Sequence, residues 1–426
     1  MRFFCPSVAV CMASLAMHLC ENGSQVSAFL LQSVGRTRGT FRLSDGSGDG
    51  ETSLPLRRHS HKLRVGDSIL SSTAQPSSKD ALPAISSPDE AKKFIMMTIQ
   101  QKIQKAEESG KGIPSKYINQ LMGFIDSYVD ETLRGGQSFE GLVGLLGPLL
   151  PVLQMSQNFQ FNRVHRAVRE PTDLYAWGNA LFASLVDMKS SKIEGDSHLK
   201  TISDALQAGE NVVLLSNHQS EADPQVMSIL LDQLGFSHLG EQLICVAGHR
   251  VTSDPLSVPF SMGRNLVCIH SKKHIDNPPE MKAEKQRQNL ESMQALQDLF
   301  TTGGALIWVA PSGGRDRPDP EAPGEFKVDP YDPKSVQMFR VMAKKSKKNC
   351  HFYPLALCTH HILPPPATVN KDLGEERRVR FSPVGFALGP EVTEEAAEAG
   401  GKGKGAVAET AQEWVMQGYE RVKIVS

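Results

Sequence analysis

The sequence predicts an α/β protein in which a small N-terminal helical bundle precedes a larger α/β domain with a mixed sheet. Between residues 86 and 165 the apolar residues recur at helical spacing, which predicts the bundle. After Pro171, short β-rich apolar runs alternate with amphipathic stretches, as is typical of a mostly parallel or mixed sheet. The chain has 426 residues, 40% of them hydrophobic, which is enough for two globular parts.

Residues 1–85 have the composition of a targeting leader rather than of a folded domain. Arg2 supplies a short positive n-region, and the apolar stretch from Phe3 to Leu19 is too short and too mixed to span a membrane. Val26-Ser27-Ala28 forms a small-residue cleavage site. From Phe29 onward the chain is rich in Ser, Thr, Gly and Arg, like a transit peptide. We interpret 1–85 as a disordered bipartite leader, a signal followed by a transit-like segment. The alternative is a secretory leader followed by a disordered linker.

The bundle is predicted over residues 86–165. Ser87 and Pro88 form an N-cap and first-turn pair, and the following apolar residues predict two amphipathic helices. The most apolar run of the body, Gly141 to Leu153, is short and contains Pro148 and Pro151, so we expect a buried helix pair rather than a membrane span. The α/β domain is predicted over residues 166–426.

In the α/β domain, a helix is expected from Asp173 to Met188, and the Ala/Gly/Glu/Lys-rich segment from Glu394 to Gly405 is expected to be a flexible surface insertion. The expected strands are Val212–Leu215, Leu243–Ala247, Leu266–His270, Ala305–Ala310 and Phe352–Cys358. The expected later helices are Gln225–Leu234, Met281–Phe300, Ser335–Lys344 and Ala408–Val422.

The first candidate site follows the strand at Val212–Leu215. His218 lies just beyond the strand end, where α/β sheets place their chemistry, and Asp223 follows five positions later. The aspartate can accept one ring N–H of the histidine, which leaves the other nitrogen as a general base. The alternative is structural: an aspartate before Pro224 is also an ordinary helix N-cap.

Basic residues cluster in three loops next to predicted strands. The loops are residues 263–265, 271–274 and 312–317, and their basic residues are Arg264, Lys272, Lys273, His274, Arg315 and Arg317. Arginine can hold a phosphate through two hydrogen bonds and lysine adds a point charge, so together the loops predict a phosphate pocket. The alternative is a set of solvated surface charges, in which Asp316 pairs with the two flanking arginines and Arg264 belongs to a structural ion pair.

Composition excludes several classes of function. The formal net charge is −1 and aromatic residues make up 6%, so nucleic-acid binding is not expected. No CxxC pair is present among the seven cysteines, which argues against a structural zinc site. We expect neither a metal nor a cofactor at the candidate site.

Several blocks in the body resemble the soluble plastid-type glycerol-3-phosphate 1-O-acyltransferases. The resemblance extends over about residues 90–390 and is densest from Pro171 to Pro366. The blocks are His218-x4-Asp223, residues 246–251, 261–266 and 270–274, Ala310-Pro-Ser-Gly-Gly-Arg-Asp-Arg-Pro-Asp319, residues 353–357 and Pro364-Pro-Pro366. Two departures are His249, where the family usually has aspartate, and His360-His361, where it usually has His-Asp.

The resemblance implies a helical domain followed by an α/β acyltransferase domain. It implies transfer of a fatty acyl group from acyl-acyl carrier protein, or from acyl-CoA, to the sn-1 hydroxyl of glycerol 3-phosphate, which gives 1-acyl-sn-glycerol 3-phosphate for plastid glycerolipid synthesis. By position, His218 and Asp223 match the catalytic pair, and Lys273, His274, Arg315 and Arg317 match the phosphate-binding residues. No transmembrane span is expected, which leaves room for peripheral contact with a membrane.

The leader and the resemblance together predict the plastid stroma as the location. Two signals in series, with a phenylalanine at their junction, resemble the leaders of proteins imported into secondary plastids. Rival interpretations are a lysophosphatidic acid acyltransferase, a non-catalytic lipid or carrier-protein binding module on the same fold, and a metal hydrolase built on histidines such as His270 and His360.

Overall fold

The computed structural model describes residues 82–271, 275–319, 321–366, 375–399 and 405–424. The chain divides into two units, Met1–Leu63 and Arg64–Ser426, and the description concerns the second. Nearly all of the predicted leader lies outside the described residues. The same is true of Lys273 and His274.

Four helices form the N-terminal part, as the apolar periodicity predicts. They are α1 (Pro88–Glu108), α2 (Ile118–Arg134), α3 (Phe139–Leu146) and α4 (Leu149–Ser156). Ser87 caps α1 by accepting a hydrogen bond from the Glu90 backbone N–H at 3.3 Å. By length and composition, Phe139–Ser156 is the one candidate membrane span in the described part of the chain. Of this segment, 44% is buried inside the fold. It is also not one continuous helix, because α3 ends at Leu146 and α4 begins at Leu149.

The centre of the unit is an eight-stranded mixed sheet with the order β1-β5-β4-β6-β3-β9-β10-β2. Strands β3, β4, β5, β6 and β9 run parallel, whereas the pairs β1–β5 and β9–β10 are antiparallel. The strands are β1 (Val164–His165), β2 (Lys192–Glu194), β3 (Asn211–Ser216), β4 (Ile244–Gly248), β5 (Asn265–Ile269), β6 (Leu306–Val309), β9 (Cys350–Cys358) and β10 (Gly385–Leu388). A separate hairpin pairs β7 (Pro318–Asp319) with β8 (Ala322–Phe326).

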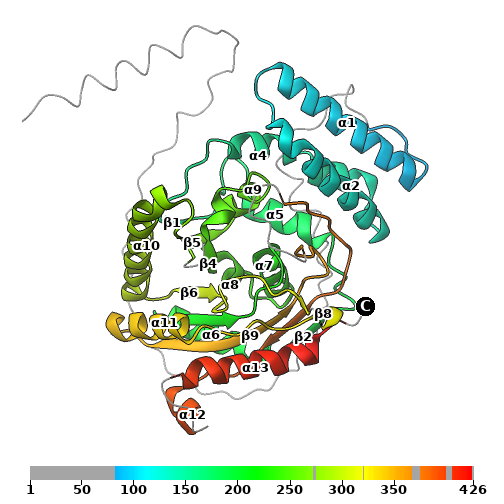
Figure 1. The fold of residues 1–426 in the computed structure, drawn as a ribbon. Coiled ribbons are helices and arrows are strands. Elements are labelled where there is room, and N and C mark those ends of the chain that lie inside the picture. The colour runs from blue at the N-terminus through cyan, green and yellow to red at the C-terminus, as the bar shows by residue number, and fades with distance from the viewer. Residues whose placement is uncertain (1–81, 272–274, 320, 367–374, 400–404, 425–426) are drawn as a thin grey trace, which may run out of the picture. The chain divides into compact units, whose positions relative to one another are not determined.

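Helices cover both faces of the sheet (Figure 1). In β3, Val212 and Leu214 face one core and Val213 and Leu215 face the other, because side chains alternate along a strand. The first face is covered by α1 to α4 and by α5 (Leu174–Ala183), α6 (Ser197–Gln207), α7 (Asp223–Gln233), α8 (Ser237–Gln242) and α9 (Val258–Met262). The second is covered by α10 (Lys282–Thr302), α11 (Pro333–Ser346), α12 (Glu394–Ala399) and α13 (Ala406–Val422).

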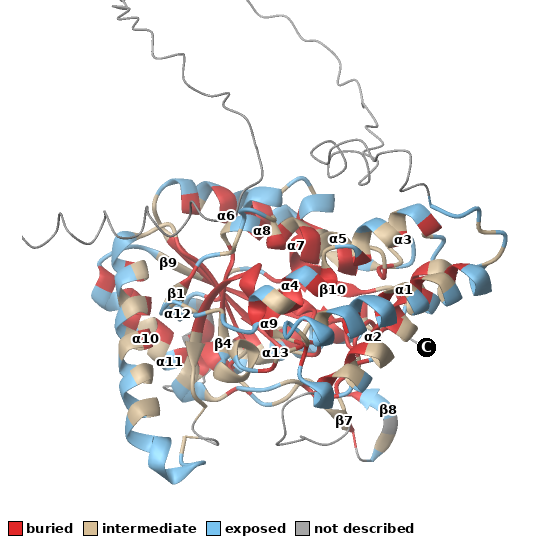
Figure 2. Cartoon of the chain, turned by 90° about the horizontal axis from the view of Figure 1, so that it is seen from above, coloured by how far each residue is buried: buried red, intermediate tan, exposed pale blue. Residues whose placement is uncertain are grey.

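The N-terminal helices share one continuous core with the first face of the sheet. Tyr128 of α2 donates a hydrogen bond to the Leu181 carbonyl at 3.0 Å, and Trp177 of α5 donates to the Leu145 carbonyl at 2.9 Å. Figure 2 shows the sheet and its neighbouring helices as the most buried part of the chain. The division of the body at residue 165 stays a prediction.

The mixed α/β fold class is confirmed, and each of the five predicted strands is present within two residues of its expected bounds. Part of the expected surface insertion, Glu394–Ala399, forms helix α12. Residues 400–404 lie outside the described residues. Since β3, β4, β5, β6 and β9 are parallel, their carboxyl ends meet at one edge of the sheet, and the loops that follow them form the candidate site there.

Candidate active site

The loop after β3 is tied to the neighbouring strand before it reaches His218. The Asn217 side chain donates to the Leu357 carbonyl at 2.9 Å and accepts from the Leu357 N–H at 2.8 Å. These two bonds replace the backbone pairing that β3 loses at its end. The start of the loop is therefore fixed to β9.

His218 and Asp223 contact each other as the spacing predicts. The ring Nδ1 lies 2.7 Å from Asp223 Oδ2. Asp223 is completely buried, whereas 25% of the His218 side chain is exposed. A carboxylate only accepts hydrogen bonds, so Nδ1 carries the proton and Nε2 keeps its lone pair. The pair thus presents a basic nitrogen.

Asp223 is not the N-cap of α7. The cap position is Ala222, and no side chain caps this helix. The Asp223 oxygens instead accept from the backbone N–H groups of Gln219 at 2.9 Å and Ser220 at 3.1 Å, and from the Thr359 hydroxyl. Together with His218 these donors hold the carboxylate in one orientation toward the ring.

Asp316 is a second buried carboxylate beside the same loop. Its backbone N–H donates to the His218 carbonyl at 2.6 Å. Its side chain accepts from Asn217 Nδ2 at 2.9 Å and from the Asp329 N–H at 3.0 Å. Burial raises the pKa of Asp316 to about 7 although these bonds oppose the rise. The alternative in which Asp316 pairs with its flanking arginines is not found, because its side chain turns toward the His218 loop.

Arg315 is held by two carboxylates. Its guanidinium donates to both oxygens of Glu375 at 3.0 and 3.1 Å, and it lies 3.6 Å from Glu221. Glu375 is buried, with 5% of its side chain exposed. Sequence reasoning missed both acids. Glu221 offers a signal, because it lies between His218 and Asp223, whereas Glu375 lies in an unremarkable charged run.

Arg377 is a further buried cation that the sequence analysis missed. It donates to Glu221 at 2.7 Å, lies 3.2 Å from Asp254 and donates to the Ser257 hydroxyl at 3.0 Å. Burial alone would raise the pKa of Glu221, but the charges of Arg377, Arg315 and Arg250 lower it to about 2. Glu221 is therefore ionised at neutral pH.

Arg317 differs from the other two arginines. It donates to the Pro366 carbonyl at 2.6 Å, and no carboxylate of the described chain lies within salt-bridge distance of it. Burial and the nearby charge of Arg315 lower the pKa of Arg317. Arg317 thus lies close to a second positive charge, that of Arg315, without a carboxylate of the described chain beside it. An anionic ligand bound between the two guanidinium groups would stabilise both charges.

Arg264 does not belong to this cluster. It is buried and donates to the Ser228 hydroxyl at 2.8 Å and to the Asn179 side-chain oxygen. Its guanidinium also stacks on the Tyr175 ring, 4.8 Å from the centroid. The ion pair that the alternative interpretation gives Arg264 is not found among the described residues. Hydrogen bonds and ring stacking hold it instead.

An apolar cavity of about 110 Å³ lies beside His218. His218, Glu221 and Arg377 supply polar groups to its lining, and the His218 ring meets the Trp308 ring edge to face at 5.4 Å. Most of the remaining lining is apolar and comes from the sheet, from α5 and α9, and from the N-terminal helices. It includes Cys245, Leu266, Phe260, Phe182, Leu121, Phe124, Leu149 and Leu153. A basic nitrogen, a group of arginines and an apolar cavity thus lie together.

Comparison with known proteins gives the family. The model of the family described as Acyltransferase matches residues 196–357. A chloroplastic glycerol-3-phosphate acyltransferase from Phaseolus vulgaris is 34% identical over 74% of this chain and 70% of its own length. This chain belongs to the glycerol-3-phosphate acyltransferase family. The resemblance seen in the sequence is confirmed.

Other chloroplastic glycerol-3-phosphate acyltransferases are similar to this chain over comparable lengths. The chloroplastic enzyme ATS12 from Cucurbita moschata is 37% identical over 72% of this chain and 67% of its own. The chloroplastic glycerol-3-phosphate acyltransferase from Arabidopsis thaliana is 41% identical over 65% of this chain and 58% of its own length. The chain thus spans between about half and two thirds of these two relatives. A solved structure, the 1-acyl-sn-glycerophosphate (LPA) acyltransferase PlsC from Thermotoga maritima, aligns over 73% of this chain and 100% of its own. Its TM-score of 0.36 and 16% identity are too low to support an argument.

Proposed function

We propose that this protein transfers a fatty acyl group from an acyl thioester to the sn-1 hydroxyl of glycerol 3-phosphate, giving 1-acyl-sn-glycerol 3-phosphate. The observation that carries the proposal is the His218–Asp223 pair, with 2.7 Å between Nδ1 and Oδ2, at the lining of the apolar cavity. The names of the relatives supply the acceptor, and the nearby arginines suit its phosphate.

His218 is the proposed general base. The glycerol hydroxyl gives its proton to Nε2 while its oxygen attacks the thioester carbonyl. The new C–O bond forms, the C–S bond breaks, and the imidazolium returns the proton to the leaving thiolate. Asp223 orients the ring and stabilises its charged form. This route uses no acyl-enzyme and leaves the chain unchanged at the end of the cycle.

Arg315 and Arg317 are the proposed phosphate ligands. Arg317 supports this role most directly, because its guanidinium has no carboxylate partner in the described chain. Arg315 keeps two carboxylates of its own, so we assign it a shared role in binding phosphate and in holding Glu375. Lys273 and His274, outside the described residues, are proposed as further ligands of the same phosphate.

The acyl chain is proposed to lie in the apolar cavity, and the donor is acyl-acyl carrier protein or acyl-CoA. A carrier protein is acidic, so its docking on a basic surface should weaken as ionic strength rises. The relatives are named chloroplastic, and we propose the plastid stroma as the location, reached through the bipartite leader of a secondary plastid. Peripheral contact with a membrane is compatible with this proposal.

The direct test is an acyl-transfer assay with two acceptors. Glycerol 3-phosphate and lysophosphatidic acid are each offered with one acyl donor, and the products are separated by mass spectrometry and positional analysis. We expect acylation of glycerol 3-phosphate at sn-1. Preferred acylation of lysophosphatidic acid would favour the rival enzyme, and the lack of any turnover with either acceptor would favour a binding module.

A further inference from the structure

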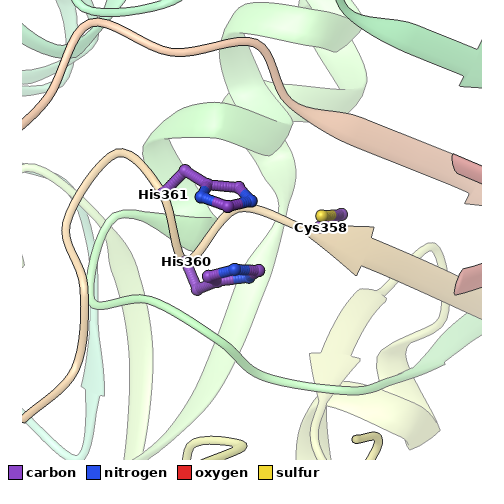
Figure 3. Close-up of side chains that lie close together, drawn as sticks. All are labelled: Cys358, His360 and His361. Carbon is purple, nitrogen blue, oxygen red and sulfur yellow. The ribbon is translucent and has the colours of Figure 1, made fainter. Parts of the chain in front are cut away.

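A group of three metal-ligating side chains lies where β9 ends, next to the His218 loop but not in the lining of the apolar cavity. Cys358, His360 and His361 come from four consecutive positions, and one ligand atom of each lies within 4.8 Å of the others. Figure 3 shows the two imidazoles one above the other, with the Cys358 sulfur to one side. The centroids of the two rings are 3.9 Å apart. Close packing of one thiol and two imidazoles is a donor set that transition metals use.

Each histidine already donates one ring proton to a carbonyl oxygen. His360 Nδ1 lies 2.9 Å from Gln219 Oε1, and that oxygen also accepts the Thr359 backbone N–H at 3.1 Å. His361 Nε2 lies 3.3 Å from the Ile424 carbonyl oxygen. Carbonyl oxygens only accept, so each ring keeps a lone pair on its other nitrogen. Metal-ligating histidines are oriented by such bonds in this way.

We propose that Cys358, His360 and His361 bind one copper(I) ion as a three-coordinate site. A thiolate and two imidazoles suit soft or borderline metals, copper(I) and zinc above all. The group contains no carboxylate, so hard cations such as magnesium and calcium are poor candidates.

Charge separates copper(I) from zinc. Cys358 is completely buried and His360 is 5% exposed, so an uncompensated charge at this position is costly. Copper(I) with one thiolate forms a neutral complex, whereas zinc leaves one positive charge. Lys192, Lys423 and Arg380 already act on this group electrostatically, which makes a further positive charge less favourable.

To close around an ion, the ligand atoms must approach one another and the two rings, with centroids 3.9 Å apart, must turn so that their free nitrogens converge. Metal–sulfur bonds of about 2.3 Å and metal–nitrogen bonds of about 2.0 Å require ligand atoms roughly 3.5 Å apart. The spread of 4.8 Å therefore closes by about 1 Å. His361 is half-buried, so the ion has a path from solvent. The Cys358 proton leaves to solvent as the thiolate binds.

The test is a competition between the full-length protein and a chromogenic copper(I) chelator, under reducing and anaerobic conditions. Three proteins are compared: the wild type, Cys358→Ser and Cys350→Ser. Cys350 is the matched control because it lies at the other end of β9 and outside the group. Cysteines of the leader contribute equally to all three. We expect Cys358→Ser to retain one copper equivalent less than the wild type and Cys350→Ser to match the wild type.

His361→Gln supplies a second variant that keeps Cys358 in place. It should weaken copper binding at this site by at least about tenfold without changing the thermal melt. Equal copper retention by the wild type and Cys358→Ser, or by the wild type and His361→Gln, would overturn the site. Tighter binding of zinc than of copper at the Cys358-dependent site would overturn the assignment of the ion. Acyl transfer is not a readout here, so the result is independent of the proposed enzyme activity.

Discussion

At the scale of single residues, three carboxylates near His218 have different hydrogen-bond partners and therefore different roles. Asp223 accepts the ring N–H and two backbone N–H groups, so it orients the histidine. Asp316 holds the loop through Asn217 and the His218 carbonyl. Glu221 compensates the buried Arg377. Only Asp223 contacts the histidine ring, so only Asp223 is proposed to act on the proton transfer.

Arg315→Ala and Arg317→Ala should differ in their effect on stability. Among the described residues Arg317 has no carboxylate partner, so its removal should raise the KM for glycerol 3-phosphate by about tenfold to a hundredfold and leave the melting temperature unchanged. Removing Arg315 also leaves the buried Glu375 with a poorer partner, at a cost of about 3 kcal/mol in unfolding free energy. Steady-state kinetics and urea unfolding measure both effects. Equal stability loss in the two variants would contradict this distinction.

Glu221→Gln tests the ion pair with Arg377 through pH. The pKa of Glu221 falls from 4.5 to about 2 on folding, which corresponds to no more than about 3 kcal/mol of stabilisation. The folded pKa is depressed, so this stabilisation is fully present above pH 4.5 and is lost as the pH falls toward 2. The variant should be less stable than the wild type at pH 7, and the difference should shrink below pH 4.5.

The control for this measurement is Glu376→Gln, because Glu376 is exposed and pairs with Arg378 at the surface. Its effect on unfolding free energy should stay within about 0.5 kcal/mol at every pH. A Glu221→Gln difference that is as large at pH 3.5 as at pH 7 would mean that the charge of Glu221 is not what stabilises the fold.

At the scale of elements, the N-terminal helices supply part of the wall of the cavity. Leu121 and Phe124 come from α2, and Leu149 and Leu153 come from α4. The helices therefore do more than cover the sheet, since the proposed acyl site is incomplete without them. Their side chains set how much space an acyl chain has.

Leu153→Phe should reduce that space and disfavour long acyl donors. We expect kcat/KM to fall more for long-chain than for short-chain thioesters. The control is Leu150→Phe on the same helix, because Leu150 is also buried but does not line the cavity. Both changes should cost about 1–3 kcal/mol of stability through overpacking. An identical chain-length profile in the two variants would contradict the assignment of the cavity.

The long elements of the fold were predictable from local pattern, and the ion pairs of the site were not. Residues 212–215 form an apolar β-rich run, and β3 is found there. The edge strand β2 has three residues, none of them fully buried, so its sequence shows no apolar run or alternation that would predict a strand. His218 and Asp223 lie in one loop, whereas Glu221 and Arg377 are 156 residues apart. Such a pairing depends on the order of strands in the sheet, which a single sequence does not display.

At the scale of the whole molecule, the described fold contains every element of the proposed chemistry except Lys273 and His274. The body should therefore fold and act without residues 1–85. Deleting them should leave a cooperative melt and normal turnover. Loss of both would mean that the segment is structural. Fused to a fluorescent protein, residues 1–85 should direct it to a plastid, and fluorescence that stays in the cytosol would contradict the proposed leader.

The most direct test of the proposed catalysis is the steady-state kinetics of His218→Ala with glycerol 3-phosphate as the acceptor. Removal of a general base lowers turnover by about 10²- to 10⁴-fold, while the arginines still bind the phosphate. We predict a kcat reduced by that amount, a KM close to that of the wild type, and an unchanged thermal melt. A kcat close to that of the wild type in a folded variant would contradict the role of His218.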